Sequence, residues 1–142
     1  MAIYVDYAAT APMRKEAITR YVEVAERVVG NASSTHQLGR EARSVVDRAR
    51  RIFAQKIHAR PNEMIFTSGG TEADNLAILG VAHASTQKGH IVTTAIEHQA
   101  VLRAFEQLER EGWRVTYLAP DADGFISVEA IEKALEEDTK FV

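Results

Sequence analysis

Short β-prone runs alternate with longer amphipathic segments from residue 63 onward, and this alternation constrains the fold most. The expected strands lie at residues 63–68, 89–97, 113–120 and 139–142. The expected helices, which repeat apolar positions at helical spacing, lie at residues 71–85, 98–112 and 127–137. Because the connections are short, this order predicts a layered α/β domain with a mainly parallel sheet, flanking helices and right-handed crossovers.

The first 60 residues are organised differently. Residues 3–5 form a short β-prone run, and amphipathic helices are expected over residues 13–29 and from about residue 42 to residue 57. Between the two helices lies a small, polar loop at residues 31–39. The chain stops as a new apolar run begins at residues 141–142, and a central strand without neighbours exposes an edge. We therefore expect a fragment or one half of a split protein.

Composition excludes several classes of function. The chain has 142 residues and no cysteine, so neither a disulfide framework nor a cysteine-based metal site can form within it. A net charge of −3 argues against a nucleic-acid-binding domain. The sequence shows no signal peptide and no apolar run of membrane-spanning length, so we expect a cytoplasmic protein. The segment at 119–130 resembles a calcium loop, but alanine stands at both end positions that need a carboxylate, and no metal is expected.

The stretch FTSGGTEADN, residues 66–75, admits two interpretations. A strand running through Gly69 and Gly70 into a helix near Thr71 would leave backbone N–H groups free at the positive end of the helix dipole, where a phosphate binds well. The alternative is a capped turn, with Thr71 as N-cap and Asp74 three residues later. Glu72 counts against the phosphate, since a carboxylate in the first turn competes for the same dipole. Spacing alone leaves both interpretations open.

His98 follows the expected strand at 89–97 and opens the next helix. Open α/β sheets bind ligands at the carboxyl ends of their strands, so His98 and Thr71 would share one rim if their strands are neighbours. A histidine there could stack on a planar ligand or exchange protons. Without further information, a helix-start residue with a satisfied ring is the favoured interpretation. His36, in the polar loop, is the other candidate, whereas His58, His83 and His90 are interpreted as structural or exposed.

Four segments in this order resemble the cysteine desulfurases, which are pyridoxal 5'-phosphate (PLP) enzymes related to the class V aminotransferases. The segments are VDYAATAP (5–12), GNASSTHQLGREAR (30–43), NEMIFTSGGTEADNLAI (62–78) and IEHQAVL (96–102). The resemblance covers nearly the whole chain. The second and fourth segments look more like the branch that supplies sulfur for iron–sulfur clusters and tRNA than the sulfur-mobilisation branch.

The resemblance implies roles for particular residues. Gly70 and Thr71 match positions that hold the cofactor phosphate, and His98 matches the catalytic histidine that stacks on the pyridine ring. Ala9 and Thr10 match a segment on the substrate side of the cofactor, and Asn31 and His36 match a loop near the active site and dimer interface. The implied fold is the fold type I of PLP-dependent transferases. Residues 1–14 would join the small domain, and residues 15–142 would begin an incomplete large domain.

The resemblance also implies parts that this chain lacks. The family needs a Schiff-base lysine, an aspartate paired with the pyridine nitrogen and a mobile cysteine, all expected beyond Val142. The whole enzyme would convert L-cysteine to L-alanine as a homodimer and pass sulfur, as a persulfide, to an acceptor or scaffold protein. Two alternatives stay open. One is a selenocysteine lyase or other class V enzyme, and the other is a non-catalytic half-protein or assembly module that pairs with a second chain.

Overall fold

The computed structural model describes residues 3–7 and 9–142. The chain divides into two compact units, residues 1–65 and residues 66–142. The motif at residues 5–12 contains Ala8, which lies outside the described residues. The predicted boundary between residues 14 and 15 concerns domains of the whole enzyme and stays a prediction.

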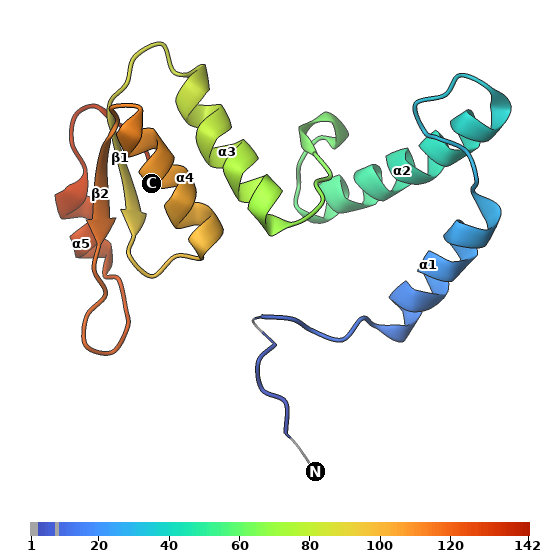
Figure 1. The fold of residues 1–142 in the computed structure, drawn as a ribbon, viewed down its shortest axis with the longest axis horizontal. Coiled ribbons are helices and arrows are strands. Elements are labelled where there is room, and N and C mark those ends of the chain that lie inside the picture. Colours follow the sequence, from blue (N-terminus) through green and yellow to red (C-terminus); the bar gives the residue numbers. More distant parts are fainter. Residues whose placement is uncertain (1–2, 8) are drawn as a thin grey trace. The chain divides into compact units, whose positions relative to one another are not determined.

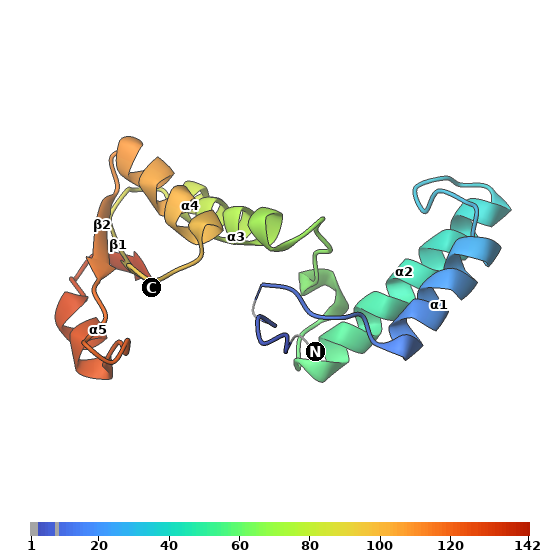
Figure 2. The same ribbon diagram turned by 60° about the horizontal axis from the view of Figure 1, so that its bottom comes forward.

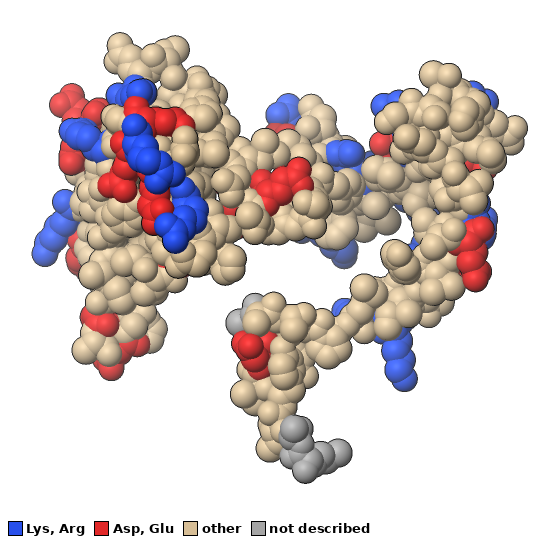
Figure 3. Space-filling view, viewed as in Figure 1, with Lys and Arg blue, Asp and Glu red and all other residues tan. Residues whose placement is uncertain are grey.

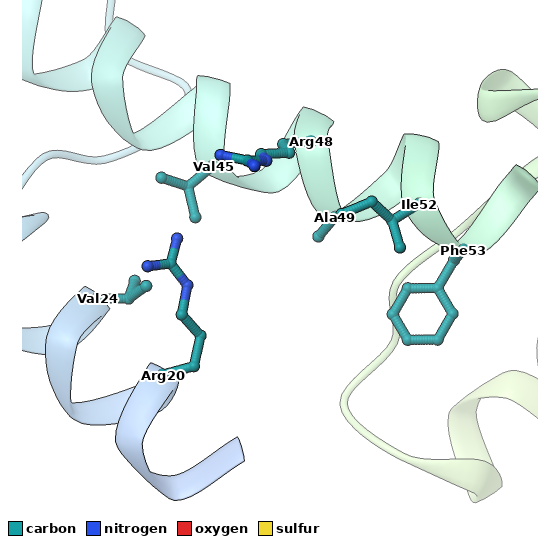
Figure 4. Close-up of a pocket in the computed structure, with 7 residues that line it drawn as sticks. All are labelled: Arg20, Val24, Val45, Arg48, Ala49, Ile52 and Phe53. Atoms are coloured by element: carbon teal, nitrogen blue, oxygen red, sulfur yellow. The ribbon is translucent and has the colours of Figure 1, made fainter. Parts of the chain in front are cut away.

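The first unit is built from α1 (Lys15–Arg27), α2 (Gln37–Lys56) and the short 3-10 helix η1 (Pro61–Glu63). Both long helices were predicted, and α1 ends two residues earlier than expected. A hollow of about 490 Å³ separates α1 from α2 (Figure 4). The residues around it are Arg20, Val24, Val45, Arg48, Ala49, Ile52 and Phe53, which include none of the predicted site residues.

Two glycines close the polar loop against the start of α2. A Cβ atom added to Gly30 would lie 2.2 Å from the carbonyl oxygen of Leu38, and one added to Gly39 would lie 2.3 Å from that of Ser34. No side chain fits at such distances, so the loop requires glycine at both positions. Glycine is needed here because the backbone segments approach each other closely, and not because of a left-handed backbone conformation.

The second unit contains α3 (Gly70–Ala84), β1 (His90–Thr94), α4 (Gln99–Arg110), β2 (Arg114–Leu118), α5 (Val128–Ala134) and β3 (Thr139–Phe141). The strands pair in the order β2–β1–β3, and both pairings are parallel. Helices connect the strands, as parallel pairing requires. The predicted α/β class with a parallel sheet and flanking helices is confirmed.

The core of this unit lies where α3 and α4, which run side by side, meet the sheet (Figures 1 and 2). Ile91 and Leu108 have no exposed surface, and Ala82, Phe105 and Trp113 surround them. Phe105 and Leu108 are three residues apart, which places both on one face of α4. Full burial of a leucine stabilises the fold by about 1.5–3 kcal/mol. The two helices are therefore anchored to the sheet, which matters because the site lies at their first turns.

Two expected strands are absent from the described residues. Residues 3–5 are irregular, and the run at 63–68 begins at the end of η1 and continues without strand pairing. A strand exists only where a neighbour accepts its hydrogen bonds. At Met64 the backbone oxygen instead accepts a hydrogen bond from the Arg50 guanidinium. The run at 63–68 has a β-prone composition, but composition alone does not supply a partner strand, so the strand prediction is wrong here.

His90 illustrates a structural histidine. Its side chain is 1% exposed, and its Nδ1 and Nε2 each lie 2.8 Å from a threonine hydroxyl, of Thr139 on β3 and Thr116 on β2. The ring thus links the three strands at the end of the sheet opposite to the expected site. His83 and His58 are exposed. These positions agree with the prediction that all three histidines are structural or exposed.

In the view of Figure 3, the described residues show basic and acidic side chains interspersed, with no face of a single sign. Over the region of α4 in that view, basic and acidic side chains alternate, and Arg103 pairs with Glu106 at 2.7 Å. Among the described residues, no helix combines the length and the apolar character that crossing a bilayer requires.

Candidate active site

The first turn of α3 offers free backbone donors. Gly69 is the N-cap, and the first backbone bond of the helix runs from the Ala73 N–H to the Gly69 oxygen at 3.1 Å. No residue within 3–7 or 9–142 accepts a hydrogen bond from the N–H groups of Gly70, Thr71 or Glu72. A Cβ atom added at Gly69 or Gly70 would meet nothing within 4 Å. The turn therefore presents unpaired donors to open space, as an anion site requires.

Glu72 is held by the residue before the N-cap. Its Oε2 accepts hydrogen bonds from the backbone N–H and the hydroxyl of Ser68, both at 2.7 Å. The Ser68 hydroxyl, followed by the Ser68 backbone N–H, lowers the pKa of Glu72 from its usual value of 4.5. The carboxylate thus stays ionised near neutral pH and is bound to the loop rather than to the first N–H groups of the helix. The Thr71 N-cap of the alternative reading is absent, because Gly69 takes that position.

His98 is the N-cap of α4. Its Nδ1 accepts a hydrogen bond from the Ala100 N–H at 3.1 Å, and the side chain is exposed. Because Nδ1 is an acceptor, the proton of the neutral ring lies on Nε2, which is the nitrogen left for other partners. In the preceding turn the Thr94 hydroxyl donates to Glu97 Oε1 at 2.8 Å, which fixes the chain between β1 and His98.

Asn75 links the starts of α3 and α4, a role that was not predicted from the sequence. Its Nδ2 donates to the Thr71 oxygen at 2.8 Å and to the Ala100 oxygen at 3.5 Å. One side chain thus joins the first turn of α3, which contains Thr71, to the first turn of α4, which His98 caps. The clue was present in the pattern. Asn75 stands three and four residues before Ile78 and Leu79, which pack against the core, so it is a polar residue on the packed face of α3.

Ala9 and Thr10 lie in an exposed turn near the start of the chain. Their N–H groups both donate to the Asp6 oxygen, at 3.2 and 3.3 Å, and the Tyr4 hydroxyl donates to the Thr10 oxygen at 2.9 Å. These bonds give the turn a defined shape. Both residues belong to the first unit, and their proposed place on the substrate side of the cofactor stays a prediction.

Asn31 and His36 occupy the loop that Gly30 and Gly39 close. Asn31 Oδ1 accepts from the Ser33 N–H at 2.8 Å, and His36 Nδ1 accepts from the Gly39 N–H at 3.2 Å. His36 thereby caps α2 in the same manner as His98 caps α4. The structure brings Asn31 and His36 together in one loop of the first unit, whereas Gly70, Thr71 and His98 converge in the second.

Comparisons with known proteins agree with this arrangement. The sequence model of the aminotransferase class-V family matches residues 3–142. Cysteine desulfurase IscS of Shewanella sediminis is 49% identical over 146 residues, which covers 100% of this chain and 36% of the relative. Cysteine desulfurase IscS of Dictyoglomus turgidum is 46% identical, with 96% and 35% covered. The chain thus spans about a third of the length of these relatives, and the expected correspondence to part of a cysteine desulfurase is confirmed.

Solved structures give the same result for the fold. A structure described as SspA in complex with cysteine is 37% identical, with a TM-score of 0.85 over 94% of this chain and 39% of that one. The apo cysteine desulfurase of Thermococcus onnurineus NA1 is 28% identical, with a TM-score of 0.80 over 93% of this chain and 34% of that one. Because the family model covers nearly the whole sequence, the chain belongs to the aminotransferase class-V family.

Proposed function

We propose that this chain forms the phosphate- and ring-binding part of a PLP site in a cysteine desulfurase. The observation that carries the proposal is the convergence of two features. These are the unpaired N–H groups of Gly70 and Thr71 at the start of α3 and the His98 ring at the start of α4. A phosphate and an aromatic ring are the two ends of PLP that a protein can hold without a covalent bond.

The residues at the start of α3 fit a phosphate. The N–H groups of Gly70 and Thr71 would donate to its oxygens, the Thr71 hydroxyl would add a further donor, and the helix dipole favours the negative charge. The space beside Gly69 and Gly70 is open to a ligand. The negative charge of Glu72 is unfavourable for phosphate binding. Two hydrogen bonds from Ser68 hold its carboxylate at the loop before the helix.

His98 fits the ring and the proton chemistry. The Ala100 N–H holds Nδ1, so the ring is oriented and Nε2 alone can pass a proton to or from a substrate. When bound, PLP supplies an electron sink for carbanionic chemistry at the substrate. The contribution of this chain is then to hold the phosphate, to cover one face of the ring and to carry a proton at His98 Nε2.

The reaction proposed for the whole enzyme is the conversion of L-cysteine to L-alanine, with sulfur leaving as a persulfide. The chain has no cysteine, so the sulfur-accepting thiol must come from polypeptide outside these 142 residues. We propose that the covalent lysine also lies outside them, as the family resemblance implies. The relatives are named cysteine desulfurase IscS, and on that basis we also propose iron–sulfur cluster supply, a homodimer and a sulfur-accepting partner. The cytoplasmic location stays a prediction from the sequence.

Thr71→Ala tests the phosphate site directly. Removing one donor to a charged oxygen should weaken inorganic phosphate binding by about 1–3 kcal/mol. Binding can be followed from the amide resonances of Gly70 and Thr71 during a phosphate titration of the chain. Thr86→Ala, an exposed threonine beyond the end of α3, is the matched control and should leave the affinity unchanged. Equal affinities for Thr71→Ala and the unmodified chain would refute the phosphate role.

A further inference from the structure

Asn75 contacts the carbonyl oxygens of two residues, and the N–H groups of the same two residues face the proposed site. Its Nδ2 donates to the carbonyl of Thr71, whose N–H is one of the free donors at the start of α3. The same nitrogen donates to the carbonyl of Ala100, whose N–H holds the Nδ1 of His98. One half-buried amide therefore bonds to the residue that would face the phosphate and to the residue that orients the ring.

The distance between these two groups decides whether one ligand can use both. A phosphate bound at α3 needs only the first turn of that helix, whereas PLP must also bring its ring to His98. Catalytic and binding groups have to be held close to their productive geometry by neighbouring hydrogen bonds. In the described part of the chain, Asn75 is the side chain that hydrogen-bonds across the two first turns.

We infer that Asn75 is a positioning residue that sets the spacing between the phosphate-binding turn of α3 and the His98 ring. The inference rests on the proposed function, because it requires that PLP use both groups. Asn75 itself touches neither end of the ligand in this arrangement. Asn75 would set the distance between the first turn of α3 and the His98 ring. The affinity of a ligand that binds only one of these two groups should therefore not change when Asn75 is replaced.

A purely structural role predicts a different outcome. If Asn75 only stabilised the packing of α3 on α4, replacing it would lower the stability and affect all ligands of the folded chain alike. The comparison of inorganic phosphate with PLP separates the two roles, since both need the α3 turn and PLP alone needs His98. Selectivity, the ratio of the two affinities, is therefore the diagnostic quantity.

Asn75→Leu keeps the size of the side chain and removes the hydrogen bonds, and Asn75→Ala is a second variant in case leucine disturbs the fold. Affinities for PLP and for inorganic phosphate are measured on the 142-residue chain from the amide resonances of Gly70 and Thr71. Ser85→Ala is the matched control. It removes the bond from the Ser85 hydroxyl to the Val81 oxygen at the far end of α3.

The unmodified chain should prefer PLP to phosphate by about two- to tenfold, the range of an aromatic contact. Asn75→Leu and Asn75→Ala should lose most of this preference and keep phosphate binding within about twofold. Adding His98→Ala to either variant should cause no further loss of preference, as expected for residues that act together. Ser85→Ala should retain the full preference.

Each remaining outcome is informative. A full preference for PLP in both Asn75 variants would overturn the inference and leave the proposed function intact. A parallel drop in both affinities would assign Asn75 to packing and would also overturn it. An unmodified chain without preference for PLP would refute the role of His98, and one that binds neither ligand would refute the phosphate role. In both of those cases the inference fails with the proposed function.

Discussion

His98 has two separable tasks in this structure, and two substitutions can separate them. The Nδ1 atom caps α4 through the Ala100 N–H, and the ring is proposed to contact the cofactor. His98→Ala removes the cap and the ring together. His98→Asn removes the ring but keeps an acceptor, because asparagine is among the strongest N-cap residues.

The stability difference follows from the surroundings of the cap. Ala100 is 7% exposed, so water cannot easily replace the lost acceptor of its N–H. Loss of an N-cap acceptor costs about 0.5–2 kcal/mol, and the burial of Ala100 places the expected cost of His98→Ala at about 1–2 kcal/mol. For a unit of this size that corresponds to a lower Tm by roughly 4–16 °C. His98→Asn should remain within about 0.5 kcal/mol of the unmodified chain.

Trp113 provides the assay. It is the only tryptophan of the chain, it is 5% exposed, and it lies in the core beside Leu108. Its fluorescence during urea unfolding therefore reports the unit that contains α4, and linear extrapolation gives the free energy of unfolding. Equal destabilisation by alanine and asparagine would refute the capping role. Affinity for PLP should fall about two- to tenfold in both variants, and an asparagine variant with unchanged affinity would refute the ring contact.

Two further substitutions test the charge at the phosphate turn and the closed loop. Glu72→Gln should raise phosphate affinity about two- to fivefold, since it removes a competing charge from the helix start. The lowered pKa of Glu72 means that the hydrogen bonds from Ser68 to its ionised carboxylate stabilise the fold above pH 4.5, and this stabilisation is lost as the pH falls through the lower, folded-state pKa. Thermal unfolding below pH 4.5 should therefore depend less on pH in Glu72→Gln, and an identical pH profile would contradict this assignment. Gly39→Ala should cost about 1–3 kcal/mol and speed amide exchange in the loop, because its Cβ would lie 2.3 Å from the Ser34 oxygen. Gly80→Ala in α3 meets nothing within 4 Å and should stabilise by about 0.5–1 kcal/mol, so equal effects at Gly39 and Gly80 would refute the loop argument.

The helices were predictable because their apolar spacing is a local property of the sequence. The positions of α1 to α5 follow that spacing, and α5 is shorter than expected because Leu135 leaves the helix with extended backbone. The strands β1, β2 and β3 were found for a similar reason, since each is bounded by a helix signal. The role of Asn75 was not predictable, because its second partner, Ala100, lies 25 residues away and depends on how α3 packs on α4.

The predicted proximity of Thr71 and His98 has a different physical cause from the one first expected. The sequence argument required the run at 63–68 to form a strand beside β1. In the structure β1 pairs with β2 along one edge and with β3 along the other, so no further strand can pair with it. The two helix starts approach instead because α3 and α4 pack together, with Asn75 bonded to both first turns. The geometry of the proposed site therefore depends on helix packing more than on sheet order. Substitutions at the α3–α4 contact should thus change ligand selectivity, while changes at the outer edges of β2 or β3 should leave it alone.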